Sequence, residues 1–105
     1  MVVLVVHIPQ THVEQVKEAL FAAGAGRLGN YEKCSFEVVG LGQFAPLMGA
    51  KPFIGKVGEV EKVVEVRLEI TLAKEDVQNV VTALKESHPY EVPSYHLIEV
   101  TTLEH

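Results

Sequence analysis

The chain has 105 residues, of which 48% are hydrophobic, and it carries a formal net charge of −5. This length and hydrophobicity predict one domain with a modest core and exclude intrinsic disorder. The only arginines are Arg27 and Arg67 and the lysines are scattered, so the clustered positive face that nucleic-acid binding needs is missing. The single cysteine excludes an internal disulfide.

The longest apolar run, residues 1–6, is far too short to span a bilayer or to serve as a signal segment. We therefore expect a cytoplasmic protein with neither nucleic acid nor membrane as a partner. Leu103, Glu104 and His105 resemble the remnant of a histidine tag, so we assign a single domain to 1–102 and exclude His105 as a ligand.

The first third of the chain predicts a strand followed by a helix. Residues 2–8 are mostly β-branched and the run closes at Pro9, which is typical of a buried strand. Thr11 and Glu14 have the spacing of a capping box, in which each side chain bonds the other residue's backbone N–H. Apolar residues continue at helical spacing, and the glycines at 24 and 26 predict the end of the helix.

The middle of the chain predicts two strands joined by a long connection. Residues 34–39 have a strand composition, and residues 64–72 alternate between apolar and charged side chains, which predicts a half-buried strand. Residues 40–58 between them are rich in glycine and are long for a hairpin loop. Long loops in compact domains are often functional.

A second helix opens at Lys74 and must end before Pro89, and residues 95–100 predict the last strand. The element order is therefore β-α-β-β-α-β. With right-handed crossovers, its simplest arrangement is an α+β, ferredoxin-like sandwich. We expect a four-stranded antiparallel sheet in the order 4-1-3-2 with both helices on one face.

The face of this sheet without helices poses a problem, because the first strand is apolar on both sides and the last one nearly so. An uncovered apolar face would be an exposed patch, so something should cover it. One solution is a symmetric oligomer. The other is that the apolar side chains of residues 40–58 fold back over the face.

Several polar side chains are expected at one end of the sheet. The first strand ends near His7, the 88–94 loop supplies His88, Tyr90 and Glu91, and the last strand begins near His96. Histidines beside a carboxylate are candidate metal ligands, so we consider a divalent metal held by His7, His88, His96 and Glu91. The alternative is that His7 bonds the backbone at a strand end and that His88 interacts with a helix C-terminus.

Two further motifs give weaker evidence for a chemical function. Cys34 is a candidate nucleophile, but the sequence places no base beside it, and a free cysteine is often only a small buried residue. The glycines at 24, 26 and 29 match the spacing of a phosphate-binding loop, yet they follow a helix rather than a strand. This context excludes a dinucleotide fold.

Four segments together resemble a known family. They are GAGRLGNYEKCSF (24–36), GQFAPLMGAKPFIG (42–55), EVRLE (65–69) and HPYEVPSY (88–95). They look like the hallmark segments of the insert domain in the NGG-one-interacting-factor-three (Nif-three-like) family, and the resemblance covers about residues 3–100. The insert is in turn similar to CutA and to PII-type signalling proteins.

The resemblance implies a homotrimer, because CutA and PII-type proteins are trimers. It does not transfer the GTP cyclohydrolase-like activity associated with the full-length family, since the flanking metal-binding halves are not in this chain. We therefore expect a non-enzymatic regulatory or ligand-sensing module. The expected ligand-binding residues are Tyr31, Cys34, Ser35, Pro52, Phe53, Gly55, His88, Tyr90 and Glu91.

CutA is linked to divalent-cation tolerance, so a CutA-like metal binder is the second hypothesis. This chain departs from the family pattern at two positions. Val92 stands where a second glutamate is usual, and His96 stands where an acidic residue is common. The loss of two carboxylates weakens any metal site that would have used them. A third hypothesis, an enzyme, would rest on Cys34.

Overall fold

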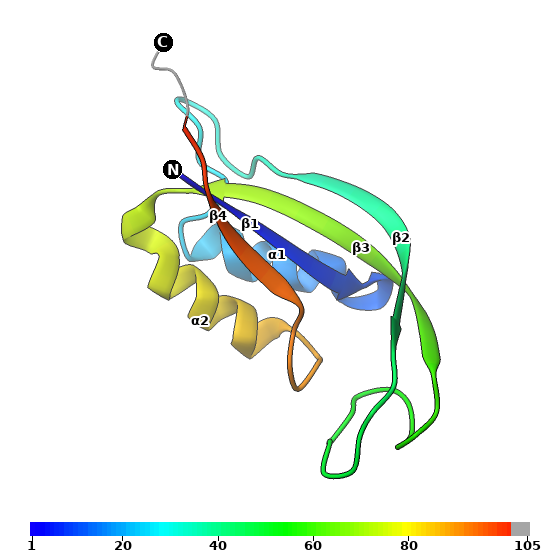
Figure 1. Ribbon diagram of the computed structural model, residues 1–105. Helices are drawn as coiled ribbons and strands as arrows, with labels where there is room; N and C mark the ends of the chain where they lie inside the picture. The colour runs from blue at the N-terminus through cyan, green and yellow to red at the C-terminus, as the bar shows by residue number, and fades with distance from the viewer. Residues whose placement is uncertain (102–105) are drawn as a thin grey trace.

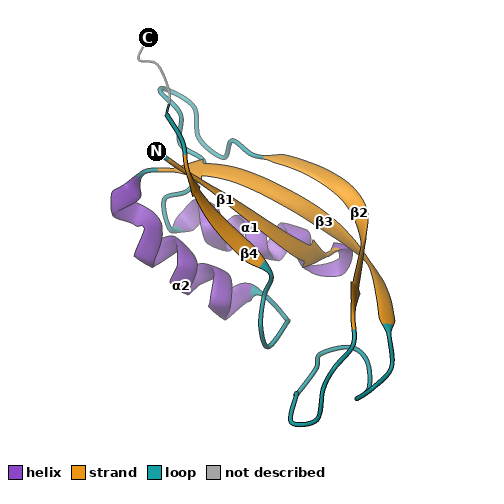
Figure 2. Ribbon diagram, in the orientation of Figure 1, coloured by secondary structure: helices purple, strands orange, loops and turns teal. Residues whose placement is uncertain are grey.

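The computed structural model describes residues 1–101, and the predicted tag remnant at 103–105 lies outside the described residues. A four-stranded antiparallel sheet lies against two helices that cover one of its faces (Figures 1 and 2). The elements in chain order are β1 (Val2–Pro9), η1 (Gln10–His12), α1 (Val13–Ala22), β2 (Phe36–Phe44), β3 (Glu61–Leu72), η2 (Lys74–Asp76), α2 (Val77–Ser87) and β4 (Tyr95–Glu99). The strand order is β2-β3-β1-β4, which confirms the predicted sheet and fold class.

The core lies between the central strands and the helices. In the register of β1 with β3, Leu4 is opposite Ile70 and Val6 is opposite Leu68. These side chains point to the helix side and are buried there with Leu20 of α1 and Leu84 of α2. Successive residues of a strand alternate between faces, so the odd-numbered residues of β1 and β3 lie on the open face.

The start of α1 differs from the capping-box prediction. Residues 10–12 form a short 3-10 turn, the helix starts at Val13, and no side chain caps it. The Thr11 hydroxyl instead bonds His12 Nδ1 at 2.8 Å. The predicted end is confirmed, because Gly24 has φ of +112° and its N–H bonds the carbonyl of Phe21. Neither helix of the described chain is long and apolar enough to cross a membrane.

The hairpin of β2 and β3 is longer than the sequence predicts. β2 starts at Phe36 rather than at Cys34 and continues through Gly40 and Gly42, and β3 already starts at Glu61. The connecting loop is therefore 45–60 rather than 40–58. The hairpin extends past the ends of the other strands and bends toward the loop between α2 and β4 (Figure 1).

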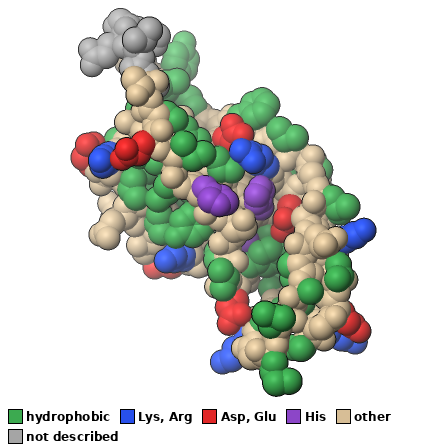
Figure 3. Space-filling model, in the orientation of Figure 1, with side chains coloured by type: hydrophobic (Ala, Val, Ile, Leu, Met, Phe, Trp, Pro, Cys, Tyr) green, Lys and Arg blue, Asp and Glu red, His purple; other side chains and the backbone are tan. Residues whose placement is uncertain are grey.

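The loop does not fold back over the open face, so that alternative is wrong. Leu47 and Met48 at its tip are 79% and 92% exposed. On the open face, Phe36, Val38 and Ile98 are also largely exposed, although Val5 is buried. Hydrophobic side chains are visible on the surface seen in Figure 3. This single chain thus leaves apolar side chains of the open face uncovered, beside the charged Arg67 and Glu69.

Candidate functional site

A cavity of about 440 Å³ lies between the β2–β3 hairpin and the 88–94 loop. Its walls come from the end of β1, the distal parts of β2 and β3, and the two loops. The lining residues are His7, Gly42, Gln43, Phe44, Pro46, Ala50, Pro52, Phe53, Ile54, Glu65, Tyr90, Glu91, Val92 and Ser94. Volumes of 300–1,000 Å³ are typical of pockets that bind small molecules.

His88 holds the 88–94 loop against the end of β1. Its Nε2 donates to the carbonyl of His7 at 2.7 Å, and its Nδ1 accepts from the backbone N–H of Tyr90 at 3.1 Å. Because a carbonyl only accepts and an N–H only donates, these partners require the neutral tautomer protonated on Nε2. Burial also lowers the pKa of His88, despite the opposing hydrogen bond to the His7 carbonyl.

Tyr90 follows directly and places its ring on the aromatic wall of the cavity. Its ring contacts Phe44 edge to face, with centroids 5.8 Å apart, and lies 6.4 Å from the Phe53 ring. The hydroxyl is buried and has no hydrogen bond of ordinary geometry among the described residues. Burial raises its pKa, and the nearby Glu65 carboxylate raises it further, so the phenol stays neutral.

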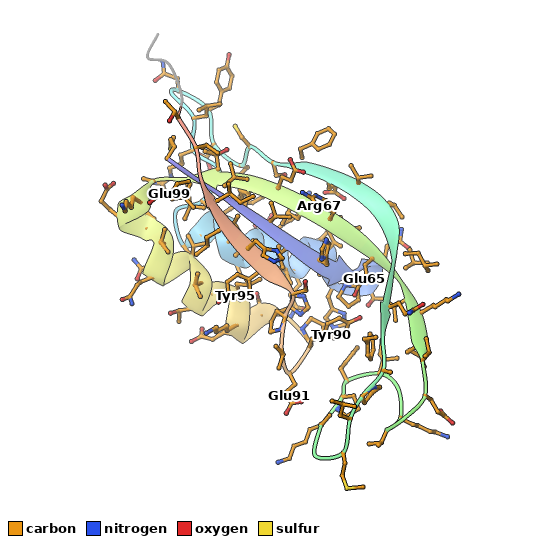
Figure 4. The ribbon with its side chains drawn as sticks, viewed as in Figure 1. Glu65, Arg67, Tyr90, Glu91, Tyr95 and Glu99 are labelled. Carbon is orange, nitrogen blue, oxygen red and sulfur yellow. The ribbon has the colours of Figure 1, made fainter. Side chains whose placement is uncertain are left out.

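Glu65 approaches Tyr90 from β3. Its side chain crosses β2 above Gly42, where an added Cβ would overlap the carboxylate. Gly40, directly opposite Glu65 in the register, has open space at the same position. The lack of a side chain at residue 42 therefore lets the carboxylate lie beside the Tyr90 hydroxyl. Figure 4 shows Glu65 and Tyr90 close together, with Glu91 farther out on the loop.

Two contacts join the tip of the hairpin to the rest of the molecule. Glu91 Oε1 accepts from the backbone N–H of Lys51 at 3.1 Å. The Phe53 ring packs edge to face on His12, with centroids 5.4 Å apart. These contacts hold the loop at the tip of the hairpin beside the 88–94 loop and η1.

The structure brings together only part of the predicted ligand-binding set. Pro52, Phe53, Tyr90 and Glu91 line the cavity, and His88 lies behind Tyr90. Gly55 is near Phe44 without lining the cavity.

Tyr31, Cys34 and Ser35 belong to the α1–β2 connection. Phe36, which follows them, is opposite Glu69 of β3, whereas the cavity end of β2 pairs with Glu61. A cleft that uses both groups would therefore need more than one chain. The Cys34 thiol is directed at the Glu32 carbonyl, 3.8 Å away. These contacts give the nucleophile hypothesis no base within the described site.

The predicted metal ligands do not form a site within one chain. No three His, Cys, Asp or Glu side chains of residues 1–101 lie close enough together to hold a metal ion. His88 has both ring nitrogens engaged and thus offers no free lone pair. Metal binding by His7, His88, His96 and Glu91 stays a prediction, and His88 would have to give up a hydrogen bond to bind a metal.

The predicted ligand-binding residues do not name Gly42, Phe44 and Glu65, although Gly42 and Phe44 lie in the 42–55 segment that carries the resemblance. The alternation of residues 64–72 places Glu65 on the charged side of a half-buried strand, and only the structure shows that its side chain crosses above Gly42. The EVRLE and GQFAPLMGAKPFIG segments contain all three residues, so the resemblance was the one available signal.

Comparisons with known proteins give relatives of two kinds. The chain is 50% identical over 97 residues to a GTP cyclohydrolase 1 type 2 homolog of Bacillus subtilis, and 42% identical over 93 residues to one of Mycobacterium tuberculosis. These matches cover 92% and 89% of the chain but only 26% and 24% of the relatives. The chain thus spans about a quarter of their length.

Similar solved structures include both NIF3-related proteins and CutA1 proteins. A Bacillus cereus protein related to NIF3 matches with a TM-score of 0.83 and 37% identity, covering 96% of this chain and 26% of the other. CutA1 from Pyrococcus horikoshii matches with a TM-score of 0.72 and 18% identity over 99% of this chain and 87% of its own. The family model for the CutA1 divalent ion tolerance protein matches residues 56–105.

Proposed function

We propose that this chain, a homologue of a segment of NIF3-related proteins with the fold of CutA, is a non-enzymatic, self-associating module that senses a small ligand. The proposed assembly is the homotrimer that the sequence resemblance implies. The activity in the name of the longer relatives is not transferred to this segment. The observation that carries the proposal is the apolar surface that one chain leaves uncovered.

The uncovered surface combines an edge strand with a sheet face. All of the first six residues of β2 are exposed, and Glu37 is the only charged residue of the strand. Long apolar edge strands that remain unpaired are prone to associate with another chain. Phe36 and Val38 of this edge lie on the same open face as Ile98 of β4, so association would cover the edge and the face together.

The assembly is tested by light scattering coupled to size-exclusion chromatography. We expect a mass three times the 11.5 kDa of one chain. Val38→Asp should give monomers, because it places a charge on the apolar face. Leu47→Asp is the matched control, since Leu47 is exposed at the loop tip away from that face. Equal masses for both variants and the parent, or a monomeric parent, would contradict the proposal.

The ligand-sensing part is tested by thermal-shift titration with nucleotides and divalent metals. A ligand at about 100 times its dissociation constant should stabilise the native state by about 2.7 kcal/mol. Replacing Tyr90 and Glu91 together by alanine should abolish the shift and leave the trimer intact. Loss of the trimer in this variant would show that the 88–94 loop builds the interface instead.

A divalent-metal binder is the second candidate function, and one observation favours it. His7 and His96 lie on the same open face of neighbouring strands, and His96 is exposed. A third donor would come from another copy. We expect His96→Asn to remove a stabilisation by Zn²⁺ or Cu²⁺ that His12→Asn retains. Equal stabilisation of both variants would contradict this site.

A further inference from the structure

The cavity between the hairpin and the 88–94 loop has a chemical character that selects one class of ligand. Its aromatic wall consists of Phe44, Phe53 and Tyr90, and two prolines and an isoleucine extend the apolar lining. Such walls favour a flat apolar body. They also attract a cation, because the faces of aromatic rings carry negative potential.

The charged groups of the cavity point to the same class. The described lining contains the carboxylates of Glu65 and Glu91 and contains neither lysine nor arginine. Glu91 already accepts a hydrogen bond from the Lys51 backbone N–H. The oxygens of Glu65 lie beside the Tyr90 hydroxyl. Because a carboxylate offers about four acceptor sites, Glu65 can accept further hydrogen bonds from a ligand. An anionic ligand would meet two carboxylates, with the His7 imidazole as the one side chain of the described lining that can become cationic.

From this geometry we infer that the cavity binds a small organic cation that carries N–H donors on a flat apolar body. The N–H groups donate to the Glu65 carboxylate, and the apolar body packs between Phe44, Phe53 and Tyr90. The inference rests on the proposed sensing function and names its ligand class.

Gly42 supplies a second, independent way to test the site. An alanine there would overlap the Glu65 carboxylate and push it away from Tyr90. The carboxylate is the end of a flexible side chain, so the displacement should leave the fold intact. Gly40→Ala is the matched control, because its added methyl group has open space on the same strand and the same face.

The experiment is a titration of the protein with benzamidine, followed by amide chemical shifts in NMR spectra. We expect shifts at residues 42–44 and 90–94 with a dissociation constant of about 1 mM or below, in keeping with the small size of the probe. Benzoate, which has the same shape and the opposite charge, should cause no such shifts. Glu65→Gln and Gly42→Ala should each weaken benzamidine binding by about tenfold, the typical effect of a lost charge-assisted hydrogen bond.

Glu69→Gln and Gly40→Ala should bind benzamidine like the parent protein. If Glu69→Gln weakens binding as much as Glu65→Gln, the attraction is general and the inference is wrong. Binding of ATP but not of benzamidine at these residues would preserve the sensor and overturn the ligand class. Sedimentation of the same samples reports on assembly separately, so a monomeric parent would count against the proposed function alone.

Discussion

The distal part of the β2–β3 hairpin, residues 41–64, extends beyond the end of β1 and is called the arm; the rest of the molecule is the body. The two regions share one alternating sequence pattern but differ in which side chains are buried. In β3, Leu68, Ile70 and Leu72 are buried against the helices, whereas Val64 in the arm is 46% exposed on the same side. Leu41 of β2 faces that side too and is 67% exposed, because no helix lies beneath the arm. The arm therefore presents apolar surface that the fold of one chain does not use.

The shape of the molecule reflects the same division. Its principal extents are 50 × 24 × 23 Å, and the long dimension follows the hairpin (Figure 1). The arm is held to the body through the Glu91–Lys51 bond and the packing of Phe53 on His12. The two regions meet at the cavity, so that a ligand there would contact both of them.

The largest expected difference between the regions is in stability. Leu68→Ala should cost about 2–5 kcal/mol of unfolding free energy, because it leaves a cavity in a close-packed core. In the dissociated chain, Leu41→Ala in the arm should cost less than about 0.5 kcal/mol, as exposed substitutions usually do. Urea unfolding at a protein concentration low enough to dissociate the assembly measures both costs. A cost for Leu41→Ala as large as that for Leu68→Ala in the dissociated chain would contradict this difference.

The next effect concerns His88, which holds the 88–94 loop to the body. His88→Ala should cost about 1–3 kcal/mol, because the His7 carbonyl and the Tyr90 N–H both lose their partner. Urea unfolding at pH 7.5 measures this cost. Exposed His96→Ala is the control and should be close to neutral. If His96→Ala lowers the unfolding free energy as much as His88→Ala does, His88 does not hold the 88–94 loop in the way proposed.

The same histidine predicts a pH dependence. Its folded pKa lies below the ordinary value of 6.5, so protonation favours the unfolded state. Its contribution to stability is complete above about pH 6.5 and decreases as the pH falls below that value. Urea midpoints at pH 7.5 and 5.5 should show this loss in the parent and in His96→Ala, and a smaller loss in His88→Ala. An equal loss in all three would assign it to other groups.

The smallest effect concerns the ion pairs of the body. Lys17 of α1 bonds Glu37 of β2 at 2.9 Å and lies 3.3 Å from Glu14. The hydrogen bond to Glu37 is the main cause that raises the pKa of Lys17. Lys17→Met should cost less than about 1 kcal/mol, because ion pairs near the surface contribute little. A cost as large as that of Leu68→Ala would contradict this ranking.

The sequence predicted the parts of the fold that depend on local patterns. The alternation of 64–72, the turn at Gly24 and the prolines around 88–94 were sufficient to predict the sheet order and the helix-covered face. The capping-box prediction rested on the spacing of Thr11 and Glu14. It was wrong because the chain forms a 3-10 turn at residues 10–12 instead. Spacing alone does not distinguish these two starts.

The cavity was predicted only in part, because it depends on register and on the bend of the hairpin. Glu65 was indistinguishable from the solvated glutamates around it until its position above Gly42 was known. Gly40 and Gly42 predicted a loop, since glycine usually weakens strands. In the structure they continue β2 into the arm, and Gly42 provides the space that the Glu65 side chain occupies.

The most direct test of self-association through the open face is sedimentation equilibrium of the protein over a hundredfold range of concentration. The proposal predicts a mass three times that of one chain, reduced to a single chain by Val38→Asp and unchanged by Leu47→Asp. A parent protein that sediments as one chain of 11.5 kDa at every concentration would contradict it.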